Sequence, residues 1–264
     1  MSENRPPNID LVYYSPTGST KKNLDALVRG LGGIKNQEIN LTKPTNRDRK
    51  EYPLGGEVVV IALPIYSSTI PHVVLNSLHN LRGDGKWAIL LSTYGNVKNG
   101  TWAANLANVL LPNGFKILAV AHGLGEHSFC CSEVPLAQKR PDFDDLMKME
   151  EYGRQIRKKY DENPTPLSIE PQEVPPLKPR PTFVELPKVN ETKCTKCRAC
   201  IYVCPVNAIN SDSLQIDEDK CTLCCACVKV CQEKARAIIF DTTPEKFENF
   251  FAYTKQRLES QLIL

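Results

Sequence analysis

Two short segments of this chain share four cysteines at the same spacing, and the second segment carries one more. They are CTKCRACIYVC (194–204) and CTLCCACVKVC (221–231), and both contain the pattern C-x2-C-x2-C-x3-C. Nine of the eleven cysteines fall in these two segments. The polar N-terminus, MSENRPPNID, has no apolar signal region, which favours a reducing compartment where disulfides are rare. The clustering therefore indicates metal binding rather than disulfide pairing.

The spacing of the cysteines distinguishes between metals. A structural zinc site usually takes two C-x2-C pairs far apart in sequence. Here three cysteines fit around one cubic cluster and the fourth is directed to a second cluster, as in bacterial two-cluster ferredoxins. We therefore predict two [4Fe–4S] clusters, with zinc as the alternative. The predicted ligands are Cys194, Cys197, Cys200 and Cys231 for cluster one, and Cys204, Cys221, Cys224 and Cys227 for cluster two.

Other cysteines and one glutamine lie outside this ligand pattern. Cys225 is inside the second segment, but the cluster is complete without it, so we predict no ligand role. Gln232 stands where the first segment has Pro205, which restores a backbone N–H near the cluster. Cys130 and Cys131 are adjacent in sequence, so their side chains diverge and a disulfide between them is not expected.

The first 160 residues alternate short apolar runs with helix-like stretches. Buried strands are predicted at 9–14, 57–63, 87–93 and 115–121, with a weaker strand at 38–40. Helices are predicted at 20–31, 71–81, 101–114 and 141–160. This alternation predicts an α/β fold with a doubly wound parallel sheet, and five strands favour the flavodoxin-like order 2-1-3-4-5.

A loop rich in hydroxyl groups follows the first predicted strand and leads directly into a helix. It reads SPTGSTKKN (15–23). Free N–H groups at a helix N-terminus favour a phosphate, and Gly18 allows close approach of the backbone. The loop lacks a Walker-type lysine, and the chain has no G-x-G-x-x-G, which disfavours nucleoside triphosphates and dinucleotides. We predict a single bound phosphate; simple capping of the helix is the alternative.

Three further loops follow predicted strands at the edge where such a sheet binds ligands. Tyr66 and Tyr94 could bracket an aromatic ring, Tyr94 being the better candidate, although local packing is the alternative for each. His122 and His127 follow the last predicted strand and could donate a proton near neutral pH. Their alternative is a local hydrogen-bonding role.

The loop sequences SPTGST, PIYSSTIP, TYGN and GEHS resemble the flavodoxin-type domain of flavodoxin–ferredoxin fusion proteins, found mainly in anaerobes. A two-cluster ferredoxin module follows in that family, as here. Ser15 and Ser19 stand where flavodoxins commonly carry Thr and Asn. The resemblance implies FMN as a cofactor. The residues implied to bind it are Ser15, Thr17, Gly18, Ser19 and Thr20 at the phosphate, and Pro64, Ile65, Tyr66, Ser67, Thr93, Tyr94, Gly95 and Asn96 at the flavin ring.

Four regions are predicted from these patterns. They are a flavodoxin-like FMN domain (1–160), a proline-rich linker (161–189), a small α+β two-cluster ferredoxin domain (190–241) and a C-terminal amphipathic helix (242–264). Proline crowding predicts an extended, semi-rigid linker. The apolar positions 247, 250, 251, 258 and 262 favour a tail helix that docks onto one of the two domains rather than a partner.

These features predict electron transfer between FMN and the two clusters, with the protein acting as a carrier between redox partners. A flavin-dependent oxidoreductase acting on a small molecule and an electron-wiring subunit of a larger complex are the alternatives. No catalytic residue is predicted, so whether the chain is an enzyme stays open, as does self-association. A net charge of +3 is too small to indicate nucleic-acid binding. No apolar run is long enough for a membrane span, so we expect a soluble cytoplasmic protein.

Overall fold

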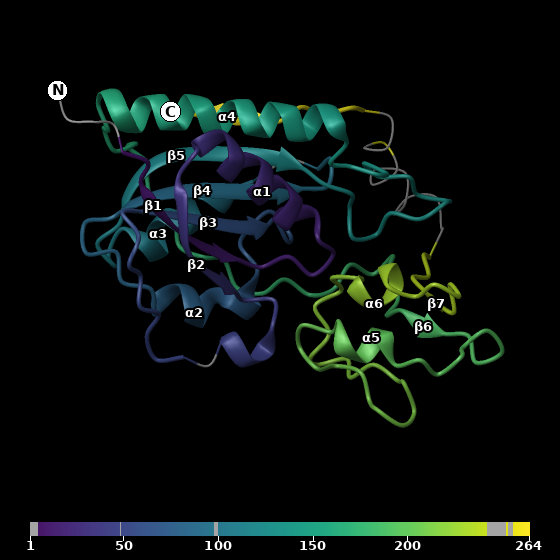
Figure 1. Cartoon of the computed structure of the whole chain (residues 1–264). Coiled ribbons are helices and arrows are strands. Elements are labelled where there is room, and N and C mark those ends of the chain that lie inside the picture. The colour runs from purple at the N-terminus through teal and green to yellow at the C-terminus, as the bar shows by residue number, and fades with distance from the viewer. Residues whose placement is uncertain (1–4, 48, 98–99, 242–251, 253–255) are drawn as a thin grey trace.

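The computed structural model describes residues 5–47, 49–97, 100–241, 252 and 256–264 (Figure 1). The first 160 residues supply five parallel strands in the order β2-β1-β3-β4-β5, which confirms the predicted flavodoxin-like order. The strands are β1 (Asn8–Tyr13), β2 (Ile34–Asn40), β3 (Val58–Pro64), β4 (Trp87–Tyr94) and β5 (Lys116–Leu124).

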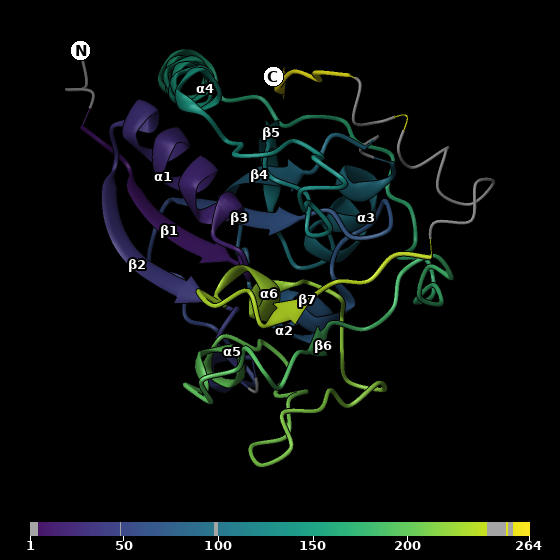
Figure 2. The same cartoon turned by 90° about the vertical axis from the view of Figure 1, so that its right-hand side faces the viewer.

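Helices cover both faces of this sheet, so its strands are buried on both sides (Figures 1 and 2). Along β3, Val58, Val60 and Ala62 face one core, while Val59, Ile61 and Leu63 face the other. Such two-sided burial explains why the strands are continuous apolar runs in the sequence. Helices α1 (Ser19–Leu31) and α4 (Phe143–Glu162) pack on the first side, and α2 (Leu75–His79) and α3 (Trp102–Leu110) on the second.

Helices α1 and α4 cross at two facing glycines. A Cβ atom on Gly30 would lie 1.9 Å from the carbonyl oxygen of Glu150, and one on Gly153 would lie 2.2 Å from that of Leu27. The two backbones therefore approach more closely than any other residue type would allow at these positions. This contact fixes α1, and with it the loop that precedes α1, against the sheet.

The predicted helices at 71–81 and 101–114 are shorter in the structure. Residues His72–Val74 form a 3-10 turn (η2) ahead of α2, and another 3-10 turn (η1) spans Pro44–Asn46. Pro71 precedes η2, and Pro112-Asn113-Gly114 follow α3. These residues limit regular helix at both places. No helix among the described residues has the length and apolar character that crossing a membrane requires.

The C-terminal tail differs from its prediction. We predicted a helix over 242–264, but residues Gln261–Ile263 form strand β8, which pairs antiparallel with the free edge of β5. The apolar positions 247, 250 and 251 lie outside the described residues. Leu262 packs against the core between α1, α4 and the sheet. The tail, predicted to dock onto one of the two domains, therefore contacts the flavodoxin-like domain, with a strand in place of a helix.

The proline-rich linker is extended, but it does not hang free. The amide of Leu167 donates to the carbonyl of Ile117 at 2.7 Å, and the Asn105 side chain donates to the carbonyls of Gln172 and Glu173. Leu167, Ile169 and Val174 pack against the core on the α2/α3 side. The linker therefore runs along the α/β domain toward the cysteine repeat.

The cysteine repeat folds into a small separate unit beneath the sheet (Figure 1). It contains α5 (Ala199–Tyr202), α6 (Ala226–Lys229) and a two-stranded antiparallel sheet of β6 (Lys188–Val189) and β7 (Arg236–Ala237). Strand β6 begins before the predicted boundary at residue 190, and α4 extends two residues past the boundary at 160.

Candidate electron-transfer site

The two cysteine segments have the same backbone conformation, residue for residue, at an offset of 27 positions (221 minus 194). Left-handed backbone recurs in three matched pairs: Lys196 with Leu223, Arg198 with Cys225, and Asn207 with Lys234. Helices α5 and α6 also match at this offset. We call residues 194–204 repeat one and residues 221–231 repeat two.

The last cysteine of each repeat accepts the same backbone hydrogen bond. The amide of Ala208 donates to Cys204 Sγ at 3.2 Å, and that of Ala235 donates to Cys231 Sγ, also at 3.2 Å. Amide donors to sulfur stabilise the thiolate form that binds iron and tune a cluster's potential. Equivalent support at Cys204 and Cys231 suits two equivalent ligand positions.

Cys204 of repeat one lies among the cysteines of repeat two. Burial, with a smaller contribution from the Cys204 thiol, raises the pKa of Cys224 to about 11 and that of Cys227 to about 12. Burial also raises the pKa of Cys221, again with a contribution from Cys204. This arrangement agrees with the crossed ligand set predicted for cluster two. Iron must therefore displace protons from thiols that burial keeps protonated.

Within the described residues, no three His, Cys, Asp or Glu side chains converge where they could share one metal ion. A [4Fe–4S] cluster does not require such convergence, because each of its irons takes one thiolate. Cys225 is 2% exposed and packs with Phe129, Val184 and Leu223 in a small apolar core between the two units. Its position therefore suits a packing role rather than ligation.

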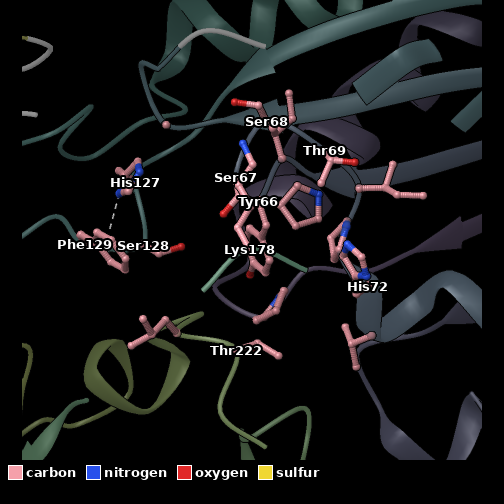
Figure 3. A pocket seen from close by; sticks show the side chains of 18 of the residues that line it. Tyr66, Ser67, Ser68, Thr69, His72, His127, Ser128, Phe129, Lys178 and Thr222 are labelled. Atoms are coloured by element: carbon pink, nitrogen blue, oxygen red, sulfur yellow. Dashed lines mark hydrogen bonds between the residues drawn. The ribbon is translucent and has the colours of Figure 1, made fainter. Parts of the chain in front are cut away.

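A cavity of about 620 Å³ lies where the carboxyl ends of the parallel strands meet the cysteine unit. Its size falls within the range of small-molecule and cofactor sites. The α/β domain contributes the loops after β1, β3, β4 and β5. The linker residues 176–181 and the loop 219–223, which includes Cys221, supply the opposite wall. Figure 3 shows Thr222 of this loop facing Tyr66, with His127 on one side and His72 on the other.

The hydroxyl-rich loop forms one end of this cavity. Gly18 has φ +88°, a conformation that glycine adopts without strain, and it lies at the N-cap of α1 without a side chain to cap the helix. Ser15 Oγ accepts the amide of Lys21 at 3.0 Å. Helix geometry leaves the amides of Ser19 and Thr20 without partners inside the helix, so they are available for phosphate oxygens.

The loops predicted to bind the flavin ring also line the cavity, except at Asn96. The predicted residues that line it are Thr17, Ser19, Thr20, Pro64, Ile65, Tyr66, Ser67, Thr93, Tyr94 and Gly95. Ser15, Gly18 and Asn96 do not line it. Asn96 instead bonds the tail, donating to the Gln256 carbonyl and accepting the Leu258 amide. Tyr94 is 4% exposed and donates its hydroxyl to the Glu259 carbonyl at 2.7 Å.

The two histidines after β5 separate in the structure. His127 lines the cavity, and its Nδ1 accepts the Phe129 amide at 3.0 Å. His122 does not line it; its Nδ1 lies 2.6 Å from Ser92 Oγ, and its ring packs edge-on against Trp102. Burial lowers the pKa of each to about 4. Both imidazoles are therefore neutral at pH 7, and the predicted proton donation near neutral pH is not supported.

The low pKa of His122 predicts a pH-dependent loss of stability. An unfolded histidine takes up a proton near pH 6.5, whereas folded His122 does so only near pH 4. The contribution of neutral His122 to the free energy of unfolding is therefore fully present above about pH 6.5. It is lost as the pH falls toward 4, by up to about 1.4 kcal/mol per pH unit. The thermal midpoint should fall less between pH 7.5 and 5.5 in His122→Asn than in the wild type. Parallel curves for the wild type and the variant would contradict this.

Contacts between the two units hold the cavity wall in place. Lys229 Nζ lies 2.5 Å from Glu126 Oε1 and donates to the Cys130 carbonyl at 2.7 Å. The Arg47 guanidinium donates to the carbonyl of Pro205, the residue after Cys204. The Lys229 bonds and the apolar core around Phe129 position repeat two against the loop after β5. The Arg47 bond ties the end of repeat one to the segment after β2.

Buried polar atoms near the cavity test whether a cofactor fits. His72 Nε2 is buried and has no hydrogen-bond partner among the described residues. His72 and Thr222 line the cavity, and Tyr14 packs edge-on against Tyr66. Leaving a buried polar group unpaired is costly, so a polar ligand atom beside His72 suits this space. The hydroxyl-rich helix start and the flanking aromatic side chains fit a phosphate-bearing ring compound such as FMN.

The cavity includes residues that the sequence analysis did not single out. They include His72, Lys178, Thr222 and Leu223. Ser68 and the loop 125–128 belong to the loops PIYSSTIP and GEHS quoted above, and they also line the cavity. Lys178 and Thr222 come from the linker and repeat two, and their places depend on how the two units dock.

Comparison with known proteins bears on both units. Residues 187–210 and 214–236 match the family model described as "4Fe-4S binding domain". Residues 187–236 therefore contain a 4Fe-4S binding domain. Two matched repeats support two [4Fe–4S] clusters, and the zinc alternative has no such support. No curated protein sequence matches the chain significantly.

Solved structures similar to the chain include flavodoxins and flavodiiron proteins. An archaeal flavodoxin aligns with 15% identity over 57% of this chain and 97% of its own, with a TM-score of 0.37. A flavodoxin from Streptococcus pneumoniae TIGR4 aligns with 15% identity over 57% and 98%, with a TM-score of 0.40. The Flv1 flavodiiron core from Synechocystis sp. PCC6803 aligns with 16% identity over 57% and 35%, with a TM-score of 0.39. The assignment of a flavodoxin-like fold rests on the strand order.

Proposed function

We propose that this protein transfers electrons between FMN, bound in the cavity, and the two [4Fe–4S] clusters of the cysteine repeat. The proposal depends on one observation: the cavity that begins at the helix α1 phosphate loop ends at Cys221, a predicted ligand of cluster two. A flavin in that space would lie next to the cluster of its own chain. No partner chain is needed to bring the two cofactors together.

When bound, FMN exchanges two electrons with a donor, and each cluster passes one at a time. The residues of the chain hold and separate these groups. The α1 amides would bind the phosphate, Tyr66 and Thr93 would contact the ring, and Lys178 places a positive charge at the wall. Neutral His127 lies beside them without contributing a charge.

The cavity wall favours a carrier over an enzyme that acts on a small molecule. Linker residues 176–181 and loop 219–223 cover the side opposite the α/β loops. With FMN in place, this cover leaves the clusters as the route by which electrons leave or arrive. Cluster one would lie closer to the surface, because Cys197 is exposed whereas Cys224 and Cys227 are buried. We infer the order FMN, cluster two, cluster one, redox partner.

Anaerobic purification tests the proposal. We expect about eight irons, about eight sulfides and one FMN per chain, from the ligand count. Flavin reduced by light and an external donor should then lose its electrons to the clusters, seen as bleaching of the broad cluster absorbance. The variant Ser19→Pro removes one α1 amide donor and should lower FMN content while iron and sulfide stay unchanged. A colourless protein, or one with zinc and no sulfide, would overturn the proposal.

A further inference from the structure

The internal repeat of the cysteine unit has one covered face and one open face. In repeat two, Leu223 and Cys225 are buried against Phe129 of the α/β domain. Lys229 reaches the same loop through Glu126 and the Cys130 carbonyl. These three positions of repeat two form the surface that docks onto the flavodoxin-like domain.

The equivalent surface of repeat one is uncovered. At the offset of 27 residues, Leu223 corresponds to Lys196, Cys225 to Arg198 and Lys229 to Tyr202. Both Lys196 and Arg198 are exposed, and Tyr202 is 84% exposed. Neither cation has an acidic partner among the described residues. We call Lys193, Lys196, Arg198 and Tyr202, around the exposed Cys197, the cluster-one face.

The chemistry of this face differs from that of its counterpart. Apolar Leu223 and Cys225 suit a permanent contact within one chain, whereas Lys196 and Arg198 suit a contact that forms and breaks in water. Six consecutive residues contain three cations, Lys193, Lys196 and Arg198. The one acid close to them in the sequence is Glu191. An exposed tyrosine beside cations is typical of protein interfaces, where aromatic and arginine side chains are enriched.

We propose that the cluster-one face is the docking surface for an acidic electron-transfer protein, which meets repeat one as the flavodoxin-like domain meets repeat two. The inference rests on the proposed electron transfer. Lys193, Lys196 and Arg198 attract the acidic surface of the partner and speed the encounter. Tyr202 supplies the central contact, and Cys197 brings cluster one to the interface.

Two haem proteins of opposite charge test this docking: the acidic soluble domain of cytochrome b5 and the basic cytochrome c. The full holoprotein is reduced with dithionite, freed of excess reductant and mixed with each oxidised cytochrome in a stopped-flow instrument. We expect the rate constant with cytochrome b5 to fall as salt increases, because attractive charges are screened. That with cytochrome c should depend on salt weakly or in the opposite sense.

The decisive variant is the double charge reversal Lys196→Glu/Arg198→Glu. We expect it to lower the cytochrome b5 rate constant at low salt at least about tenfold, as changes in interfacial charge act mainly on association. The matched control is Lys148→Glu/Lys158→Glu on α4, at the opposite end of the molecule from α5 in both views (Figures 1 and 2). It makes the same change in net charge and should alter the rate less than about twofold. Tyr202→Ala should lower the rate without changing its dependence on salt.

Several outcomes would overturn the proposal. Equal effects of the two charge reversals would show that only net charge matters. An unchanged rate in Lys196→Glu/Arg198→Glu would place the exit for electrons elsewhere. Cluster potentials, measured by redox titration, must stay the same in each variant, because a shifted potential would mean that the variant changes the cluster and not docking. Dithionite reduces the clusters directly, so a protein that lacks FMN would refute the proposed function while leaving this test intact.

Discussion

Cys224→Ala should remove cluster two and leave cluster one, lowering iron from about eight to about four per chain. Cys224 is 7% exposed and lies beside Cys204 and Cys221, so its loss opens the ligand set nearest the cavity. In the wild type, cluster two would lie between FMN and cluster one. Without it, electron transfer from flavin to cluster one should slow by orders of magnitude. Iron and sulfide analysis with flavin-to-cluster kinetics measures both effects.

The adjacent residue provides the control for this experiment. Cys225→Ala also removes a thiol group, one position along the chain, at a buried site where no iron ligand is predicted. It should retain both clusters and the wild-type kinetics, with a stability loss of about 1 kcal/mol from the small cavity it creates. Cys197→Ala should instead remove cluster one and leave transfer from flavin to cluster two intact. Loss of both clusters in Cys225→Ala would contradict the ligand assignment.

Arg140→Met should destabilise the flavodoxin-like domain by roughly 3–5 kcal/mol, because it leaves a buried carboxylate without its partner. The Arg140 and Asp145 side chains are 6% and 3% exposed and form a two-bond ion pair. Asp145 also closes the capping box of α4 with Asp142, and Arg140 donates to the Leu258 carbonyl of the tail at 3.0 Å. The expected fall in thermal midpoint is about 6–20 °C.

Two further variants separate the missing charge partner from general damage at residue 140. Arg154→Met breaks exposed pairs with Glu150 and Glu151 and should change the stability far less than Arg140→Met, because solvent screens exposed pairs. Arg140→Met/Asp145→Leu removes both buried charges and should recover part of the stability lost in Arg140→Met. A double variant that is less stable than Arg140→Met would show that the capping role of Asp145 outweighs the ion pair.

The sequence predicted the strands of the sheet well because β1, β3, β4 and β5 are buried on both faces and are therefore nearly continuous apolar runs. Strand β2 is mostly exposed, with only Ile39 buried, which explains why only its end was recognised. Three of the four ligands predicted for each cluster follow a local spacing, so the sequence alone suffices to propose them, and the ligand assignment stays a prediction.

Features that depend on long-range docking were not predictable in the same way. Strand β8 is three residues long and forms because the edge of β5 is available, which no local pattern in the tail reveals. Asn105 holds the linker through Gln172 and Glu173, so an apparently free spacer becomes part of the domain surface. His122 and His127 lie five residues apart, but only His127 follows the end of β5 into the cavity.

The pairing of β8 with β5 also orders events during biosynthesis. Strand β5 leaves the ribosome well before residues 188–241, and β8 leaves after them. Until then one border of the sheet has unsatisfied backbone groups, and such borders recruit strands from other chains. Premature termination before residue 261 would leave this border without β8 and therefore open to aggregation.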